Sequence, residues 1–86
     1  METKQVQNYH IDLARLKALR IRAGLTQNQV SRILGYKSTL GYHYIESGRC
    51  RLRADQLLTL AQLYGVSIDS LIISNEAADH AQQSVS

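Results

Sequence analysis

Glycine placement, together with the absence of proline, most restricts how this chain of 86 residues folds. Four of the five glycines, Gly24, Gly35, Gly48 and Gly65, fall where a run of regularly spaced apolar residues breaks, so they mark the ends of elements. Between them, apolar residues recur three and four positions apart, a spacing typical of amphipathic helices. The pattern therefore predicts several short helices and no strand pair.

Cap residues mark where these helices begin. Thr26 and Ser38 are good N-caps for the second and third helices, and Ser67 for a short last one. Five helices make the expected fold all-α, a compact bundle. The first helix carries an apolar stripe of Leu13, Leu16, Leu19 and Ala23. The second is expected over 27–34, with Val30, Ile33 and Leu34 pointing inward, and the third over 39–47. The fourth carries Leu57, Leu58, Leu60, Ala61 and Leu63, and the short fifth helix carries Ile68, Leu71, Ile72 and Ile73.

The length leaves room for one small domain. We expect an N-terminal arm over 1–10, a folded domain over 11–73 and a polar tail over 74–86. No apolar run approaches the roughly 20 residues that cross a bilayer, and the N-terminus is polar rather than signal-like. The expected location is therefore the cytoplasm.

Charge is strongly polarised along the chain. Up to Arg53 there are ten basic and three acidic side chains, whereas beyond it there are four acidic residues and no Lys or Arg. One basic half and one acidic half are the footprint of a surface that meets a polyanion. A solvated basic face without a partner gives the same pattern, so charge alone leaves both interpretations open.

Little in the sequence points to catalysis or to metal binding. Cys50 is the only cysteine, which excludes an intramolecular disulfide and a cysteine-based zinc site. His10, His43 and His80 form no pair four residues apart on a helix, so no metal is expected. There is no carboxylate pair, no nucleophile with a base and no glycine-rich phosphate loop in a supporting context. We expect neither an enzyme nor a cofactor.

The most specific stretch runs from Gly24 to Gly48. It reads Gly-Leu-Thr-Gln, Val-Ser-x-Ile-Leu-Gly and Tyr-x-x-Ile-Glu-Ser-Gly, and Gly-Val-Ser-Ile-Asp-x-Leu follows later. Two crossing helices need a small side chain where their axes approach, which Ser31 supplies, and Gly35 suits the turn between them. Over about residues 11–73 these motifs together resemble the phage repressor and Cro type of helix-turn-helix, the XRE-like family.

The resemblance implies a lambda-repressor-like domain whose third helix enters the major groove of DNA. It also implies a partly buried ion pair between Arg20 and Glu46 that holds this helix against the scaffold. Gln27 would contact phosphate and brace the third helix, and the loop 49–53 would follow the flanking backbone. The residues carried over to a DNA interface are Gln27, Lys37, Ser38, Thr39, Leu40, His43, Tyr44, Arg49, Arg51 and Arg53.

The third helix departs from the usual chemistry of base readout. It lacks the Gln, Asn or Arg that makes bidentate contacts with bases, and the turn before it has one residue more than the shortest family version. Readout would instead use Leu40 against a thymine methyl, hydroxyl and imidazole hydrogen bonds, and DNA shape. Tyr42 is expected in the core, from its spacing with Ile45.

The resulting hypothesis is a sequence-specific transcriptional regulator of bacterial, phage or plasmid origin. A module this small needs a homodimer on a pseudo-palindromic operator, with half-sites about 34 Å apart, to act as repressor or activator. The final helix carries more apolar surface than it can bury against the core, which suggests that this surface forms the contact between the two subunits of the dimer. The expected dimer interface is Tyr64, Ile68, Leu71, Ile72 and Ile73.

Two alternatives remain open at this stage. The first is an antitoxin-type module that binds a toxin or another protein through the tail 74–86. The second is a helix-turn-helix that has lost DNA binding and makes only protein contacts, which the unusual third helix leaves open. Salt-dependent binding to DNA distinguishes both from a regulator.

Overall fold

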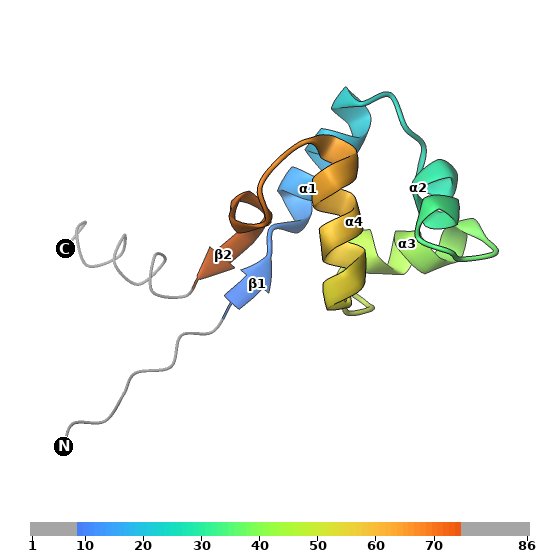
Figure 1. The fold of residues 1–86 in the computed structure, drawn as a ribbon. Coiled ribbons are helices and arrows are strands. Elements are labelled where there is room, and N and C mark those ends of the chain that lie inside the picture. Colours follow the sequence, from blue (N-terminus) through green and yellow to red (C-terminus); the bar gives the residue numbers. More distant parts are fainter. Residues whose placement is uncertain (1–8, 75–86) are drawn as a thin grey trace, which may run out of the picture.

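The computed structural model describes residues 9–74 as a helical body with a small two-stranded ribbon (Figure 1). In this view α2 and α3 lie on one side of α1 and α4, and the two strands lie on the other side. The elements in chain order are β1 (Tyr9–Ile11), α1 (Leu13–Arg22), α2 (Gln27–Ile33), α3 (Thr39–Glu46), α4 (Ala54–Tyr64), the 3₁₀ helix η1 (Ile68–Leu71) and β2 (Ile72–Ser74).

Side-chain caps start α2 and α3 at the predicted residues. The Thr26 hydroxyl accepts from the Gln29 N–H at 3.1 Å, and the Gln29 amide oxygen accepts from the Thr26 N–H at 2.8 Å, which completes a capping box. The Ser38 hydroxyl accepts from the Leu40 N–H at 3.3 Å. Each of these two helices ends one residue earlier than predicted. α4 ends at Tyr64 and is capped by Gly65, whose φ of 67° is left-handed.

The core gathers side chains from all four α-helices and from η1. Tyr42 is fully buried in it, as its spacing with Ile45 predicts. Ile33, expected to point inward, is 46% exposed, because a helix as short as α2 presents only a narrow stripe to the core and Val30 with Leu34 fills it. The buried apolar residues are Leu16, Val30, Tyr42, Ile45, Leu60, Ala61 and Leu71.

The expectation of five α-helices without strands is wrong at the C-terminal end. Ser67 does cap a helical turn, since its hydroxyl accepts from the Ser70 N–H at 3.3 Å, but this turn is a 3₁₀ helix that ends at Leu71. The chain then becomes extended, as two successive β-branched isoleucines favour. β2 runs antiparallel to β1, pairing Tyr9 with Ser74, His10 with Ile73 and Ile11 with Ile72.

Asp12 connects this ribbon to the helical body. Its N–H donates to the Leu71 carbonyl at 2.8 Å, just beyond the strand pair. Its carboxylate accepts from the Arg15 N–H at 3.1 Å and so caps α1. The first and last described elements therefore meet at the start of α1.

The described residues bear only partly on the expected domain limits. β1 includes Tyr9 and His10, which the sequence places in an arm over 1–10, and β2 ends at Ser74. Residues 1–8 and 75–86, and with them nearly all of the expected polar tail, lie outside the described part. No helix within 9–74 is long and apolar enough to cross a membrane.

Candidate nucleic-acid interface

α3 has two faces with different environments. Tyr42 and Ile45 on its inner face are at most 1% exposed. On the outer face Leu40 is 52% exposed, Tyr44 is 36% exposed, and His43 is also exposed. The inner face therefore anchors the helix, while the outer face is free to meet another molecule.

Ser31 forms the crossing point of α2 and α3. Its side chain is fully buried, and its hydroxyl donates to the Ser38 carbonyl and accepts from the Tyr42 N–H at 3.2 Å. An uninterrupted first helical turn would join that carbonyl and that N–H directly. Ser31 therefore does more than the sequence predicts for it, because besides being small it bonds the start of α3 to α2.

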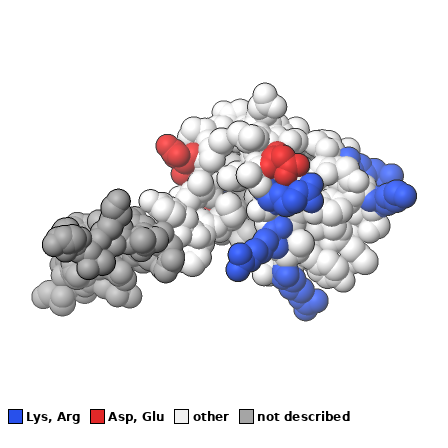
Figure 2. All heavy atoms as spheres, turned by 60° about the horizontal axis from the view of Figure 1, so that its bottom comes forward, with Lys and Arg blue, Asp and Glu red and all other residues white. Residues whose placement is uncertain are grey.

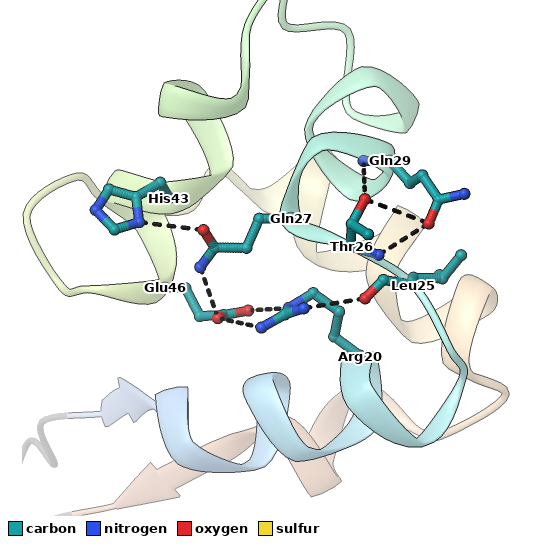
Figure 3. Close-up of polar contacts among 7 residues, drawn as sticks. All are labelled: Arg20, Leu25, Thr26, Gln27, Gln29, His43 and Glu46. Atoms are coloured by element: carbon teal, nitrogen blue, oxygen red, sulfur yellow. Dashed lines mark hydrogen bonds and ion pairs between the residues drawn. The ribbon is translucent and has the colours of Figure 1, made fainter.

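An ion pair ties α3 to α1, as expected for Arg20 and Glu46 (Figure 3). The Arg20 Nε and Nη2 donate to Glu46 Oε2 and Oε1 at 2.9 and 3.1 Å, and Nη1 donates to the Leu25 carbonyl at 2.9 Å. The Gln27 amide nitrogen also donates to Glu46 Oε1, at 2.9 Å. The side chains of the pair are only 12% and 4% exposed, so α1, α2 and α3 meet at a buried, bidentate contact.

Hydrogen bonding decides the protonation of the cluster formed by Arg20, Gln27 and Glu46. Burial works to raise the pKa of Glu46, but the hydrogen bonds from Arg20 and Gln27 outweigh it and lower that pKa below its ordinary value. The hydrogen bond to Glu46 raises the pKa of Arg20. Burial, assisted by the nearby Tyr64 and Glu46, raises the pKa of the Tyr42 hydroxyl far above its ordinary value. Glu46 therefore remains a carboxylate with hydrogen-bond donors around it.

Tyr36, in the turn between α2 and α3, forms a contact that sequence reasoning missed. Its ring packs so closely on Gly41 that a Cβ at that position would overlap it. Its hydroxyl accepts from the Gln56 amide nitrogen at 2.8 Å, and Gln56 is only 2% exposed. The one signal of this contact in the sequence is Gly41, because a glycine inside a predicted helix can mark a place where another group packs closely against the backbone. This contact ties the turn and α3 to α4.

The predicted contact residues at the start of α3 lie together on the surface. Lys37, Ser38 and Thr39 are all exposed. The Thr39 hydroxyl donates to the Asn28 side-chain oxygen at 3.0 Å, a further link between α2 and α3 that no sequence pattern suggested. Gln27 is half-buried, and its side chain bonds to Glu46 and His43, so in the described structure it braces α3.

The basic loop follows α3 directly and folds back onto it. The N–H groups of Arg49 and Cys50 donate to the Tyr44 carbonyl at 2.8 and 3.1 Å, and the Arg49 guanidinium lies 5.9 Å from the centre of the Tyr44 ring. Arg51 is exposed. Figure 2, which brings the bottom of Figure 1 forward, shows basic side chains in the centre and at the right, with acidic ones along the upper part.

Arg53 differs from its two neighbours. It forms an exposed ion pair with Asp55 at 3.1 Å, and the hydrogen bond that it donates to Asp55 raises the pKa of Arg53. Its charge is therefore partly balanced within the protein. Of the three loop arginines, Arg49 and Arg51 offer more positive charge to an anionic partner.

Comparison with known families agrees with this geometry. The family described as Helix-turn-helix domain, which is related to the XRE type, matches residues 13–71. The chain belongs to this family. A search of curated proteins finds no significant match. The helix-turn-helix unit consists of α2, the turn through Tyr36 and α3, and family membership indicates a DNA-binding regulator.

The expected dimer interface of this helix-turn-helix protein needs one correction. Leu71 is fully buried, because η1 turns it into the core against α1 and α4, and it therefore cannot line a surface seam. Tyr64, Ile68 and Ile72 are half-buried, and Ile73 is 42% exposed.

Proposed function

We propose that this helix-turn-helix protein is a sequence-specific transcriptional regulator that inserts the outer face of α3 into the major groove of an operator. The observation that carries the proposal is the contrast across α3. Its inner side is buried and bonded to α1 and α2, and the turn before it is bonded to α4, while its outer face is exposed beside a basic loop. A rigidly held helix with free outer side chains suits base recognition.

Contacts with DNA divide into two kinds in this proposal. Ser38, Thr39 and Leu40 at the start of α3 meet base edges, with Leu40 against a thymine methyl, and His43 and Tyr44 extend the surface. The basic residues Lys37, Arg49, Arg51 and Arg53 meet phosphates, and Gln27 holds α3 in place. Phosphate contacts set the position of the protein on DNA, and base contacts set the sequence that it prefers.

Selection from a random DNA pool, followed by sequencing, tests the proposal. We expect an enriched pseudo-palindromic motif and an affinity that falls steeply with salt, since phosphate contacts release counterions. A folded protein that enriches no motif would contradict it. The alternative of a toxin-binding module depends on the tail 74–86, of which the structure describes only Ser74, so no observation favours it.

We also propose a homodimer whose seam is the β1–β2 ribbon, where Ile73 is 42% and Tyr9 63% exposed. The same patch on both subunits would give a two-fold interface that suits half-sites about 34 Å apart. Ile73→Asp should convert the dimer to a monomer in sedimentation analysis. Ile21→Asp is the matched control, because Ile21 is 58% exposed on α1, away from the ribbon. An unchanged dimer in Ile73→Asp would place the seam elsewhere.

A further inference from the structure

His43 contacts its surroundings through one ring nitrogen and leaves the other facing outward. Its Nδ1 lies 3.2 Å from the Gln27 side-chain oxygen, and its Nε2 points away from the cluster (Figure 3). The ring is exposed on the outer face of α3. What Nε2 offers to a partner therefore depends on where the hydrogen of the neutral imidazole sits.

A chain of donors and acceptors places that hydrogen. Glu46 is a carboxylate that accepts from Arg20, so it can only accept from Gln27 as well. The Gln27 amide nitrogen must then face Glu46, and its oxygen must face His43. An amide oxygen only accepts, so the hydrogen of neutral His43 sits on Nδ1. The outward Nε2 consequently carries a lone pair and no hydrogen.

We infer that Glu46 and Gln27 hold neutral His43 in the Nδ1–H tautomer, so that its Nε2 accepts a hydrogen bond from an exocyclic amino group in the major groove. The inference rests on the proposed function, which places this face against bases. In the major groove adenine and cytosine offer amino donors, whereas guanine and thymine offer only acceptors. His43 therefore selects A or C over G or T at one position of the strand that it contacts.

His43 is well suited to distinguish bases that offer a hydrogen-bond donor from bases that offer only acceptors. The exposed Tyr44 hydroxyl both donates and accepts, so it tolerates either kind of base edge. The hydroxyls of Thr39 and Ser38 are engaged within the protein, by the Asn28 side-chain oxygen and the Leu40 N–H. The Leu40 side chain makes no hydrogen bond. A side chain restricted to accepting separates amino from keto bases, and Gln27 imposes that restriction on His43 from another helix.

Long-range ¹H–¹⁵N correlation NMR on the full chain, without DNA, tests the tautomer. At pH 8, where imidazoles are ordinarily neutral, we expect the hydrogen of His43 on Nδ1. Gln27→Ala removes the acceptor and should return His43 to the Nε2–H form that free histidine favours. Gln62→Ala, the same exchange at an exposed site on α4, should change nothing. An Nε2–H signal in the unaltered protein would overturn the inference.

Selection from a random DNA pool tests the readout. At the motif position that His43→Ala weakens, we expect A or C to be favoured about three- to tenfold, the effect of one hydrogen bond. His43→Lys, which only donates, should reverse this preference toward G or T. A G or T preference in the unaltered protein, or an unchanged motif in His43→Ala, overturns the inference and leaves the proposed function standing. A folded protein that enriches no motif overturns the proposed function instead.

Discussion

The α2–α3 unit is joined by hydrogen bonds from side chains, whereas the β1–β2 ribbon depends on backbone hydrogen bonds and on the burial of Leu71 beside it. Hydrogen bonds between helices join α2 to α3. Ser31 bonds to the start of α3, Thr39 donates to Asn28, and Gln27 donates to Glu46. The two strands of the ribbon pair through their backbones at three positions. Leu71, the residue directly before β2, is fully buried in the core and so fixes the ribbon to the helical body. Hydrogen bonds are directional, whereas apolar burial is not. The side-chain hydrogen bonds therefore fix how α3 lies against α2, which suits the proposed role of α3 in base recognition.

Removing the buried anchor beside the ribbon should have the largest effect. We expect Leu71→Ala to lower the free energy of unfolding by about 3–4 kcal/mol, since it leaves a cavity in the core. Ile21→Ala, at a side chain that is 58% exposed on α1, should cost less than about 0.5 kcal/mol. Urea denaturation monitored by circular dichroism measures both. Equal losses would show that the C-terminal segment is not held by burial.

Removing the negative charge of the cluster should have a smaller effect that depends on pH. At pH 7, Glu46→Gln should lower the free energy of unfolding by about 2 kcal/mol, because Arg20 loses its charged partner. Asp55→Asn removes the exposed ion pair and should leave the urea midpoint unchanged.

The sign of the pH dependence follows from the lowered pKa of Glu46. Its stabilising contribution is complete above the ordinary value of 4.5 and is lost as pH falls through the lower pKa of the folded state. The difference in stability between Glu46→Gln and the unaltered protein should therefore shrink in acid. A constant difference between pH 7 and about pH 3 would argue against the charged contact.

Loss of the Ser31 hydroxyl should cost less again. We expect Ser31→Ala to lower the free energy of unfolding by about 1–2 kcal/mol, because the Tyr42 N–H loses a buried partner. The matched control is Ser47→Ala, where an exposed hydroxyl donates to the Tyr44 carbonyl at 3.1 Å. Thermal melts of both variants decide whether the hydroxyl or only the small size of Ser31 matters.

Exposed charge in the loop should have the smallest effect on stability. We expect Arg51→Ala to leave the melting temperature unchanged and to reduce the slope of log affinity against log salt by about one, the loss of one phosphate contact. Arg53→Ala should reduce the slope less, because Asp55 already pairs with Arg53. Fluorescence anisotropy on one DNA duplex across a salt series measures both slopes, and identical reductions would contradict this ranking.

Sequence reasoning succeeded where the signal is local. Thr26 and Ser38 cap helices because their hydroxyls reach N–H groups two or three residues away. The position of Tyr42 in the core follows from helical spacing alone. The Arg20–Glu46 pair, which spans 26 residues, came from resemblance to a family and not from any local pattern.

Sequence patterns did not predict contacts whose two residues lie far apart along the chain. The Ser31 hydroxyl, the ring of Tyr36 on Gly41 and its bond to Gln56 each depend on how helices pack against one another. The tautomer of His43 likewise depends on Gln27, on another helix. None of these contacts changes the periodicity from which elements are predicted.

The ribbon and the helix-turn-helix separate the two sources of information most clearly. Local spacing and capping place α2, its turn and α3, because neighbouring residues satisfy most of the backbone of a helix. Extended segments instead need backbone partners. Those of Ile72–Ser74 are on Tyr9–Ile11, which is far away along the chain although it is adjacent in space. Packing of the whole chain was needed to bring these segments together and to turn Leu71 inward while Ile73 stayed exposed, because burial is a property of neighbours in space and not of neighbours along the chain.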